Sequence, residues 1–245
     1  MALPVSGVIS ASMINVEIGR SSGASFNMNG SQERELAGRP SGSISFSHFH
    51  GKSWVVPGTS NYTSVGSYTW VCPKYNSITI RVWGGGASGK ELILDGANGS
   101  QSKFHTTLTS GGGIGGVLKN GGAGGSTSGG ASGSSVGGAG GASSGSNGGR
   151  GGHAPSGGTG GAGGTSTTSG KNGNAPGGGG GGGATSVGDG GGGGGSGGYT
   201  TRTYNLGDSG APVPGNSYSV VVGAGGASSG NNGAGATGRV TITWS

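Results

Sequence analysis

The stretch Gly84-Gly-Gly-Ala-Ser-Gly89-Lys90 has the spacing of a phosphate-binding loop and directly follows residues that alternate like a strand. In such loops backbone N–H groups cradle phosphates, the lysine reaches them, and the Ser or Thr after the lysine binds Mg²⁺. Here Glu91 takes the place of that Ser or Thr. Leu92-Ile-Leu94 with Asp95-Gly96 favours a strand and a turn, where a nucleotide site needs a helix. We therefore expect no nucleotide binding.

A second pattern, Gly207-Asp-Ser-Gly210-Ala-Pro212, is similar to the nucleophile loop of trypsin-like proteases. A serine nucleophile needs a histidine base and a group that orients this base, and no upstream histidine stands in a matching context. Cys72 is the only cysteine, which excludes an internal disulfide framework and a cysteine zinc site. The sequence predicts no enzyme and no cofactor.

His48-Phe49-His50 has a spacing that occurs in metal sites. One chain supplies only two imidazoles here, so a metal would require a homotrimer. The alternative, which we favour, is two polar positions on either side of a buried Phe49.

The composition restricts the partners. The chain has 70 glycines and 8 prolines among 245 residues, yet only 8% charged residues and a net charge of +6 without a run of Lys or Arg. Gly149-Arg150-Gly151 is a single match to RNA-binding repeats, which need many copies with aromatic residues. We expect no nucleic acid partner. The N-terminus resembles no signal peptide, and no stretch approaches 18 apolar residues, so we expect synthesis in a cytosol and no membrane span.

The chain has three kinds of region, which differ in composition and in residue pattern. Residues 1–53 form a small N-terminal module in which 12–19 and 31–38 each combine apolar spacing, a serine available as N-cap and a final glycine, and predict two short helices. Ser6-Gly-Val-Ile-Ser10 is echoed by Ser41-Gly-Ser-Ile-Ser45 in this module. A module of this length buries little core, so it should depend on a partner or on the next domain.

Residues 54–245 form a glycine-rich domain whose two ends read as strands. Apolar residues alternate with polar ones over 67–83 and again, more than a hundred residues later, within 199–244. Half of a β-sandwich therefore lies on each side of a glycine region at about 111–198. The strands can share a sheet only if this insert returns the chain to its starting point.

The glycine region has a period of three. From 148 to 165 the side chains Arg150, His153, Ser156, Thr159, Ala162 and Thr165 fall on one register, separated mostly by glycine pairs. A polyglycine II helix, with three residues per turn and a rise of about 3.1 Å, places every third side chain on one edge. Its backbone groups must bond to neighbouring helices. We expect a layered slab of such helices, with these side chains exposed and the all-glycine runs 177–183 and 190–195 packed on every side. A flexible insert is the alternative.

Order in this region is costly. Fixing a residue costs about 1–2 kcal/mol and a net hydrogen bond returns about 0.5–1.5 kcal/mol, while almost no apolar surface is buried. We therefore expect the sandwich, through Trp70, Trp83 and Trp244, to clamp the ends of the helices.

The order of the motifs is similar to that of a known family. Tyr68-Thr-Trp-Val-Cys-Pro73, Ser77 to Gly86, the glycine block, Tyr218 to Gly226 and Gly238 to Trp244 resemble the glycine-rich domain of bacteriophage tail proteins. Residues 1–53, with Phe49-His-Gly-Lys-Ser53, resemble an N-terminal segment that accompanies such domains. Among the relatives are tail-fibre tip adhesins, in which a polyglycine sandwich presents loops to a bacterial outer-membrane receptor.

The resemblance implies a phage tail or tail-fibre tip protein, located in the virion tail after assembly in the host cytoplasm. It implies other tail or fibre proteins as partners of residues 1–53, and a host receptor, either an outer-membrane protein or lipopolysaccharide. A purely structural virion protein is one alternative. An ice-binding protein is another, although Arg150 and His153 interrupt its flat face.

The loops are poor in anchors for a protein receptor, because residues 106–198 contain no Trp, Tyr or Phe. Segment 87–110 is more apolar, and we read it as a hairpin on the slab or as part of a binding face. Loop 165–176 is expected on the sandwich side and loop 184–189 on the far side. The candidate receptor-binding residues are Lys90, Phe104, His105, Arg150, His153, Lys171, Asn172, Asn174, Ser186 and Asp189.

Overall fold

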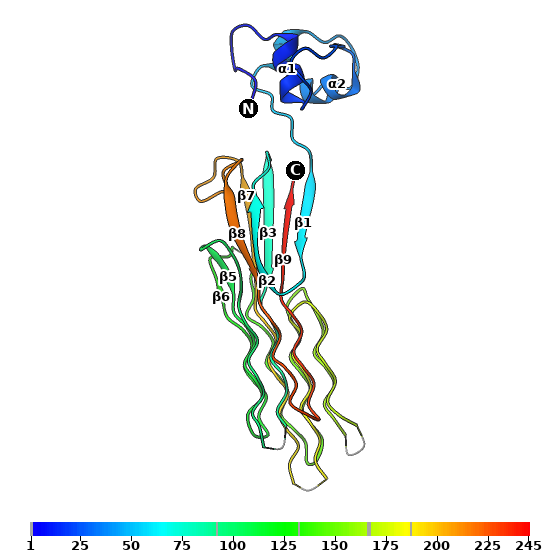
Figure 1. The fold of residues 1–245 in the computed structure, drawn as a ribbon, viewed down its shortest axis with the longest axis vertical. Helices are drawn as coiled ribbons and strands as arrows, with labels where there is room; N and C mark the ends of the chain where they lie inside the picture. Colours follow the sequence, from blue (N-terminus) through cyan, green and yellow to red (C-terminus); the bar gives the residue numbers. More distant parts are fainter. Residues whose placement is uncertain (1, 92, 132, 166–167, 187) are drawn as a thin grey trace. The chain divides into compact units, whose positions relative to one another are not determined.

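The computed structural model describes residues 2–91, 93–131, 133–165, 168–186 and 188–245 (Figure 1). The chain divides into two units, Met1–Val56 and Pro57–Ser245. The structure is mainly β, with two short α-helices and two antiparallel sheets.

The first unit contains helices α1 (Ala11–Glu17) and α2 (Ser31–Ala37) and a short 3-10 helix, η1 (Phe46–Phe49). The two predicted helices are confirmed. Ser10 caps α1, because its Oγ accepts a hydrogen bond from the Met13 amide at 3.3 Å. Gly38 ends α2 with a φ of 67°, which glycine adopts without steric cost.

A small apolar core holds this unit together. It consists of Leu3, Ile9, Ile14, Ile18, Leu36, Ala37 and Phe49. The two copies of the sequence echo have the same local structure, since Gly7 and Gly42 both have positive φ, 91° and 79°, ahead of a helix start. The echo is thus a repeated helix-entry motif.

The two histidines beside Phe49 make hydrogen bonds to the backbone. Phe49 is buried. His48 Nδ1 accepts from the Ser45 amide at 3.0 Å, and His50 Nε2 donates to the Gly7 carbonyl at 3.1 Å. These bonds account for both imidazoles within one chain.

The second unit is built on two antiparallel sheets. Their orders are β1-β9-β3-β7 and β2-β8-β4-β5-β6. The strands are β1 (Gly58–Tyr62), β2 (Gly66–Val71), β3 (Ser77–Trp83), β4 (Ser102–Phe104), β5 (Leu108–Ser110), β6 (Thr127–Ser128), β7 (Tyr199–Asn205), β8 (Ser217–Val222) and β9 (Arg239–Trp244).

Strands from both sides of the glycine region share each sheet, as expected. In the first sheet β3 lies between β7 and β9, and in the second β2 pairs with β8. The alternation predicted for 67–83 is confirmed, because Ile78, Ile80 and Val82 are fully buried while the residues between them are only partly covered. The sequence pattern does not specify strands β1 and β6.

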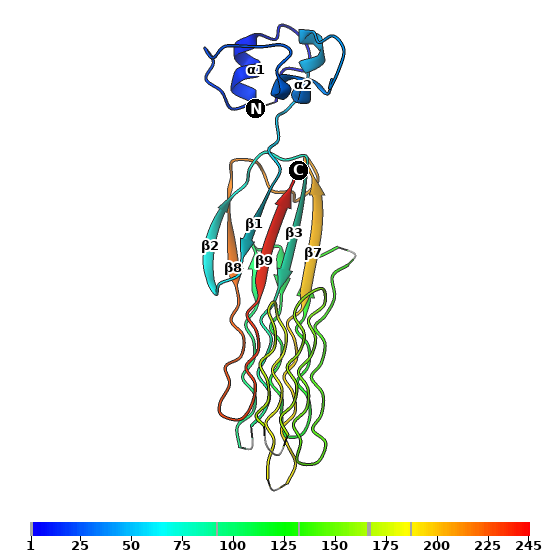
Figure 2. The ribbon, with the colours of Figure 1, turned by 90° about the vertical axis from the view of Figure 1, so that its right-hand side faces the viewer.

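Glycine-rich stretches continue from the sheets and run side by side (Figures 1 and 2). They are joined by backbone hydrogen bonds that recur every third residue. Gly191, Gly194 and Gly197 donate to Gly183, Gly180 and Gly177, respectively. We call this hydrogen-bonded region the glycine array. It comprises residues 84–90, 96–101, 111–126, 137–165, 168–186, 188–198 and 223–238.

The array has a centre and a periphery. Stretches 84–90, 177–183 and 190–198 bond to one another through Gly180 to Ala87, Ala87 to Gly195, and Gly194 to Gly180. All three are buried along their length. The remaining stretches surround them, each hydrogen-bonded to the next. Their order around the centre is 111–117, 120–126, 137–143, 147–154, 158–165, 168–174, 231–238, 223–228 and 96–101.

This arrangement explains where glycine is required. A Cβ on Gly180, Gly181 or Gly182 would overlap the carbonyl oxygen of a different neighbouring stretch in each case. The burial predicted for the all-glycine runs is therefore confirmed. In place of a specified layer order, the structure has three mutually bonded stretches at the centre with the other stretches around them.

The array is also longer in sequence than the expected 111–198. Residues 84–90, 96–101 and 223–238 belong to it, although Ala87, Ser88 and Asn98 interrupt their glycines. Within segment 87–110 only 102–110 forms the expected hairpin, β4–β5, and it belongs to a sheet. Of the strand expected over 92–94, residue 92 lies outside the described residues, and Ile93 and Leu94 lie in a bend.

Turns close the array at both ends. The turns 155–157 and 174–177 lie at the sheet end. The turns 117–120 and 144–147 lie at the far end, with the described residues of 90–95 and of 184–190. The expectation that 165–176 lies on the sandwich side is wrong at Thr165 and Thr168, although 174–176 does lie at the sheet end. Thr165 and Thr168 pair at the far end, and Lys171 then returns along the array beside Ala162. The residues described in 184–189 lie at the far end, as expected.

Of the three tryptophans, Trp83 contacts the array. The Trp83 indole N–H donates to the carbonyl of Pro155 at 3.1 Å. Trp70 and Trp244 instead pack against each other in the sandwich, with ring centroids 6.2 Å apart. The clamp expected from Trp70 and Trp244 is therefore wrong, because both lie toward the strand ends that point away from the array.

Candidate binding site

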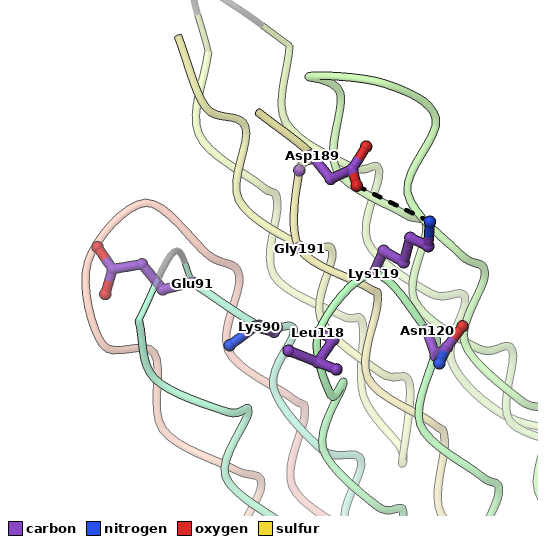
Figure 3. Close-up of a pocket in the computed structure, with 8 residues that line it drawn as sticks. Lys90, Glu91, Leu118, Lys119, Asn120, Asp189 and Gly191 are labelled. Atoms are coloured by element: carbon purple, nitrogen blue, oxygen red, sulfur yellow. Dashed lines mark ion pairs between the residues drawn. The ribbon is translucent and has the colours of Figure 1, made fainter. Parts of the chain in front are cut away.

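A cavity of about 320 Å³ lies at the far end of the glycine array (Figure 3). It opens where the ends of two central stretches meet the turn 117–120. We call it the tip cavity. Its lining consists of Lys90, Glu91, Leu118, Lys119, Asn120, Asp189, Gly190 and Gly191.

Lys90 is the last residue of a central stretch, and this position explains its burial. Its amide donates to Gly192 at 2.8 Å and its carbonyl accepts from Gly183 at 2.9 Å. Only 9% of its side chain is exposed, and Nζ donates to Asp95 Oδ1 at 3.2 Å. A buried ammonium needs such a partner, so Asp95 holds this charge at the edge of the cavity.

A second lysine-aspartate pair crosses the cavity rim. Lys119 Nζ lies 3.8 Å from Asp189 Oδ2, and both side chains are largely exposed. The dashed line in Figure 3 marks this pair, which connects the turn 117–120 with the turn 184–190. Because surface ion pairs contribute little to stability, the pair is better suited to presenting a donor and an acceptor than to holding the fold.

The turn 117–120 has an unusual residue at its corner. Val117 and Asn120 exchange both backbone hydrogen bonds, at 3.1 and 2.9 Å. Leu118 between them has a φ of 51°, a region that favours glycine, and the residue is 66% exposed. In the matching turn Ser144–Asn147 the same position is held by Gly145, with a φ of 55°. The chain thus keeps an exposed leucine where glycine fits the backbone.

The far end carries most of the negative charge of the second unit. Glu91, Asp95 and Asp189 lie there, and Asp208 is the other acidic residue after position 57. With Lys90 and Lys119 the formal charge around the cavity is −1, from three carboxylates and two ammonium groups.

The predicted site residues do not form one cluster. Lys90 and Asp189 line the tip cavity, and Ser186 is exposed on the adjoining turn. Arg150 and His153 are exposed along the side of the array, as their register predicted.

Three further candidates also lie on the side of the array. Lys171, Asn172 and Asn174 are exposed there. Asn172 Oδ1 accepts from the Ala234 amide at 2.9 Å, and Asn174 Nδ2 donates to Thr159 Oγ1 at 2.7 Å. Both asparagine side chains therefore cross-link neighbouring stretches.

Phe104 is wrong as a receptor-binding residue. It is 3% exposed and stacks on Tyr218 with ring centroids 5.7 Å apart, within the sandwich core. Its strand alternates, so an aromatic residue on the inner face is buried. His105 is exposed, but it lies in the β4–β5 turn, whose strand β5 leads away from this turn into the array. It is therefore remote from the tip cavity.

Sequence reasoning missed Leu118, Lys119 and Asn120. A signal was present, because Val117-Leu-Lys-Asn120 places four large side chains in a row between two glycine-rich runs. Glu91 enters the sequence-based prediction only as a mismatch to a phosphate-binding loop.

No metal centre is indicated. Among the described residues, no three His, Cys, Asp or Glu side chains are grouped so that they could hold a metal ion. Likewise, within the ranges that the structure describes, no helix has the length and apolar character needed to cross a membrane. No protein-family model, curated protein or solved structure matches this chain.

Proposed function

We propose that this protein is a bacteriophage tail or tail-fibre tip protein, in which a polyglycine II bundle presents turns to a receptor on the host surface. The proposal rests first on the order of motifs along the chain, which resembles that of glycine-rich tail proteins. The single structural observation that supports it best is the tip cavity at the end of a hydrogen-bonded glycine array.

The hydrogen bonding supports polyglycine II helices in the array. Such a helix has three residues per turn, so successive residues face three directions and the pattern repeats at the fourth. Gly180, Gly181 and Gly182 meet three different stretches, and the donors in 190–198 return to the same neighbour every third residue. A strand would repeat every second residue, and an α-helix would bond within itself.

This scaffold suggests a different role for each unit, receptor binding for the second and attachment for the first. Cross-bonding on all sides makes the array a rigid support, and function commonly lies in loops that a rigid scaffold positions. The turns at the far end carry the cavity and the charges. The separate unit Met1–Val56 is then available to join other tail or fibre proteins, and the protein would be located in the virion tail.

Binding to host cells tests this function. Fluorescently labelled full-length protein should bind saturably to some strains of a panel of Gram-negative bacteria, or to their isolated lipopolysaccharide, and should block adsorption of the phage that carries it. Saturable binding that is unaffected by protease treatment of the cells would indicate lipopolysaccharide, and protease-sensitive binding an outer-membrane protein. Absence of binding and of blocking, with the protein present in virions, would leave a purely structural role.

Hydrogen exchange tests the bundle. Amides of the central stretches 177–183 and 190–198 should exchange much more slowly than those of the turn 144–147. Exchange at random-coil rates throughout 111–198 would show that the region is a flexible insert.

A further inference from the structure

We propose that the tip cavity binds an uncharged sugar ring, as found in the neutral hexose units of bacterial surface glycans. This inference rests on the proposed receptor-binding function and specifies the class of ligand. It is carried by the size, polarity and charge of the cavity.

The size fits a small ligand. Binding pockets for small molecules begin at about 300 Å³, so a cavity of about 320 Å³ has room for a ligand of roughly one or two sugar rings. A folded protein loop would need a wider surface, since specific protein interfaces cover about 800 Å² on each partner.

The polar groups of the lining suit hydroxyl groups. A sugar hydroxyl both donates and accepts hydrogen bonds, so it is satisfied where a donor and an acceptor lie side by side. Lys119 and Asp189 provide such a pair at 3.8 Å, close enough for both to reach neighbouring hydroxyls. Asn120 adds an amide, which can donate and accept, on the same side of the cavity (Figure 3).

The charges argue against an anionic sugar. Asp95 already holds the Lys90 ammonium and Asp189 lies beside the Lys119 ammonium, whereas the Glu91 carboxylate points away from Lys119 and Asp189 and accepts a hydrogen bond from the Asn231 amide at 3.4 Å (Figure 3). A phosphate or a sugar acid would have to displace one of these aspartates from its lysine and would still face the other aspartate. Like charges within a few ångströms are unfavourable, so a neutral ring is the better fit.

An apolar contact is available for the carbon face of the ring. Leu118 lines the cavity and is held at its corner by a backbone conformation that glycine would adopt more readily. Residues in such conformations persist where the surrounding structure over-determines them, and they cluster at functional sites. The exposed side chain can cover the C–H groups of a sugar while Asp189 and Lys119 bind its hydroxyls.

The site is positioned by the rigid part of the array. Gly190 and Gly191 begin one central stretch and Lys90 ends another, and both are hydrogen-bonded to neighbours. Preorganisation of this kind reduces the entropy lost on binding. Affinity for a single ring should nevertheless be weak, with a Kd of about 1 mM, because few atoms are contacted.

Ligand-observed NMR on the full-length protein tests the proposal. Glucose, galactose, mannose and N-acetylglucosamine are compared with glucose 6-phosphate and a sugar acid at equal concentration. At least one neutral sugar should bind saturably, and more tightly than either anionic sugar. Asp189→Asn should weaken it roughly tenfold, as expected for loss of one charged hydrogen-bond partner.

Lys171→Met is the matched control, because Lys171 is exposed on the side of the same array. It should bind like the unchanged protein. Three results would overturn the proposal: no neutral sugar binds, an anionic sugar binds more tightly, or Asp189→Asn behaves like the control. Host-cell binding that persists when sugar binding fails would reject the sugar proposal and keep the receptor-binding function. Sugar binding without host-cell binding would reject the receptor-binding function and keep the sugar site.

Discussion

The indole N–H of Trp83 donates a hydrogen bond to the backbone carbonyl of Pro155 at 3.1 Å, across 72 residues of chain. Trp83 is the last residue of β3, and Pro155 lies in a turn at the sheet end of the glycine array. The indole also lies against Tyr199, the first residue of β7, with ring centroids 4.9 Å apart. One buried side chain thus joins a strand to the turn that closes two glycine stretches.

Trp83→Phe should loosen this turn. The change removes the donor and leaves the Pro155 carbonyl without it, which should cost about 1–3 kcal/mol of unfolding free energy. Chemical denaturation measures the loss. Hydrogen exchange should quicken at Ala154 and Gly157, whose amides bond in and beside the turn. Trp70→Phe is the control, because Trp70 lies in the sandwich core, and equal effects of both variants on this turn would contradict the role of Trp83.

Gly180→Ala should disrupt the centre of the array. The added methyl group would overlap the backbone carbonyl of Gly233, and backbone cannot move aside cheaply. We expect a loss of about 3 kcal/mol or more, as for severe overpacking. Gly141→Ala is the matched control on the periphery, where a Cβ would meet only Arg150 at 3.4 Å. Similar melting temperatures for the two variants would show that the centre is not close-packed.

Much of this architecture could be predicted from local patterns. Alternation identified the inward residues of β2 and β3, and the three-residue register placed Arg150 and His153 on the exterior. These patterns work because strand pleating and a threefold helix each fix which side chains share a face. The arrangement of the stretches around three central ones could not be predicted, because glycines carry no side chain that specifies a neighbour.

The tip cavity was predictable only in part. Lys90 is conspicuous in the sequence because it completes the spacing of a phosphate-binding loop, which is a false likeness, and Asp189 because it lies in an expected loop. Their proximity depends on which turns reach the far end. Lys171 shows the difficulty: 170–173 has only two glycines, so the sequence concealed a stretch that returns along the array. Overlooking one such stretch moves the predicted place of the neighbouring turn from one end of the array to the other.

Stability should fall at alkaline pH through two buried groups in the sandwich. Burial raises the pKa of the Cys72 thiol to about 11 and that of Tyr75 to about 12. The folded state thus holds both protons more tightly than the unfolded state. The contribution is fully present below the unfolded pKa values of 9.0 and 10.0, and it is lost as pH rises to about 11 for Cys72 and about 12 for Tyr75.

Urea denaturation between pH 8 and pH 11 checks this expectation. Cys72→Ala should be less stable at pH 8, because it leaves a small cavity, but its stability should fall less steeply above pH 9. Tyr75→Phe also removes the hydrogen bond from the Tyr75 hydroxyl to the Pro212 carbonyl at 2.6 Å, and its slope above pH 10 should be reduced. Unchanged slopes in both variants would mean that neither group is responsible.

Leu118→Gly should separate stability from binding. Glycine adopts the φ of 51° at this corner without steric cost, so the variant should be as stable as the unchanged protein or more stable by up to about 1 kcal/mol. Binding of a neutral sugar should weaken, because the apolar contact is lost. Gly145→Ala in the matching turn should have the opposite effect on stability, a loss of about 1–2 kcal/mol. Thermal melts of both variants check the two opposite changes in stability, and ligand-observed NMR checks sugar binding.

Arg20→Met should destabilise the first unit alone. Arg20 Nη1 donates to Glu33 Oε1 at 2.6 Å, and the Glu33 side chain is 0% exposed while that of Arg20 is 32% exposed. Removing the cation leaves a buried carboxylate without its counter-charge, which should cost about 3 kcal/mol, the low end for such pairs because Arg20 is partly hydrated. The double variant with Glu33→Gln should recover part of the loss. Limited proteolysis of the single variant Arg20→Met should cleave within 2–56, while 57–245 should resist cleavage. The single variant should also enter virions poorly, although it should still bind to host cells. Equal protease resistance of the first unit in all three proteins would contradict this account of the pair.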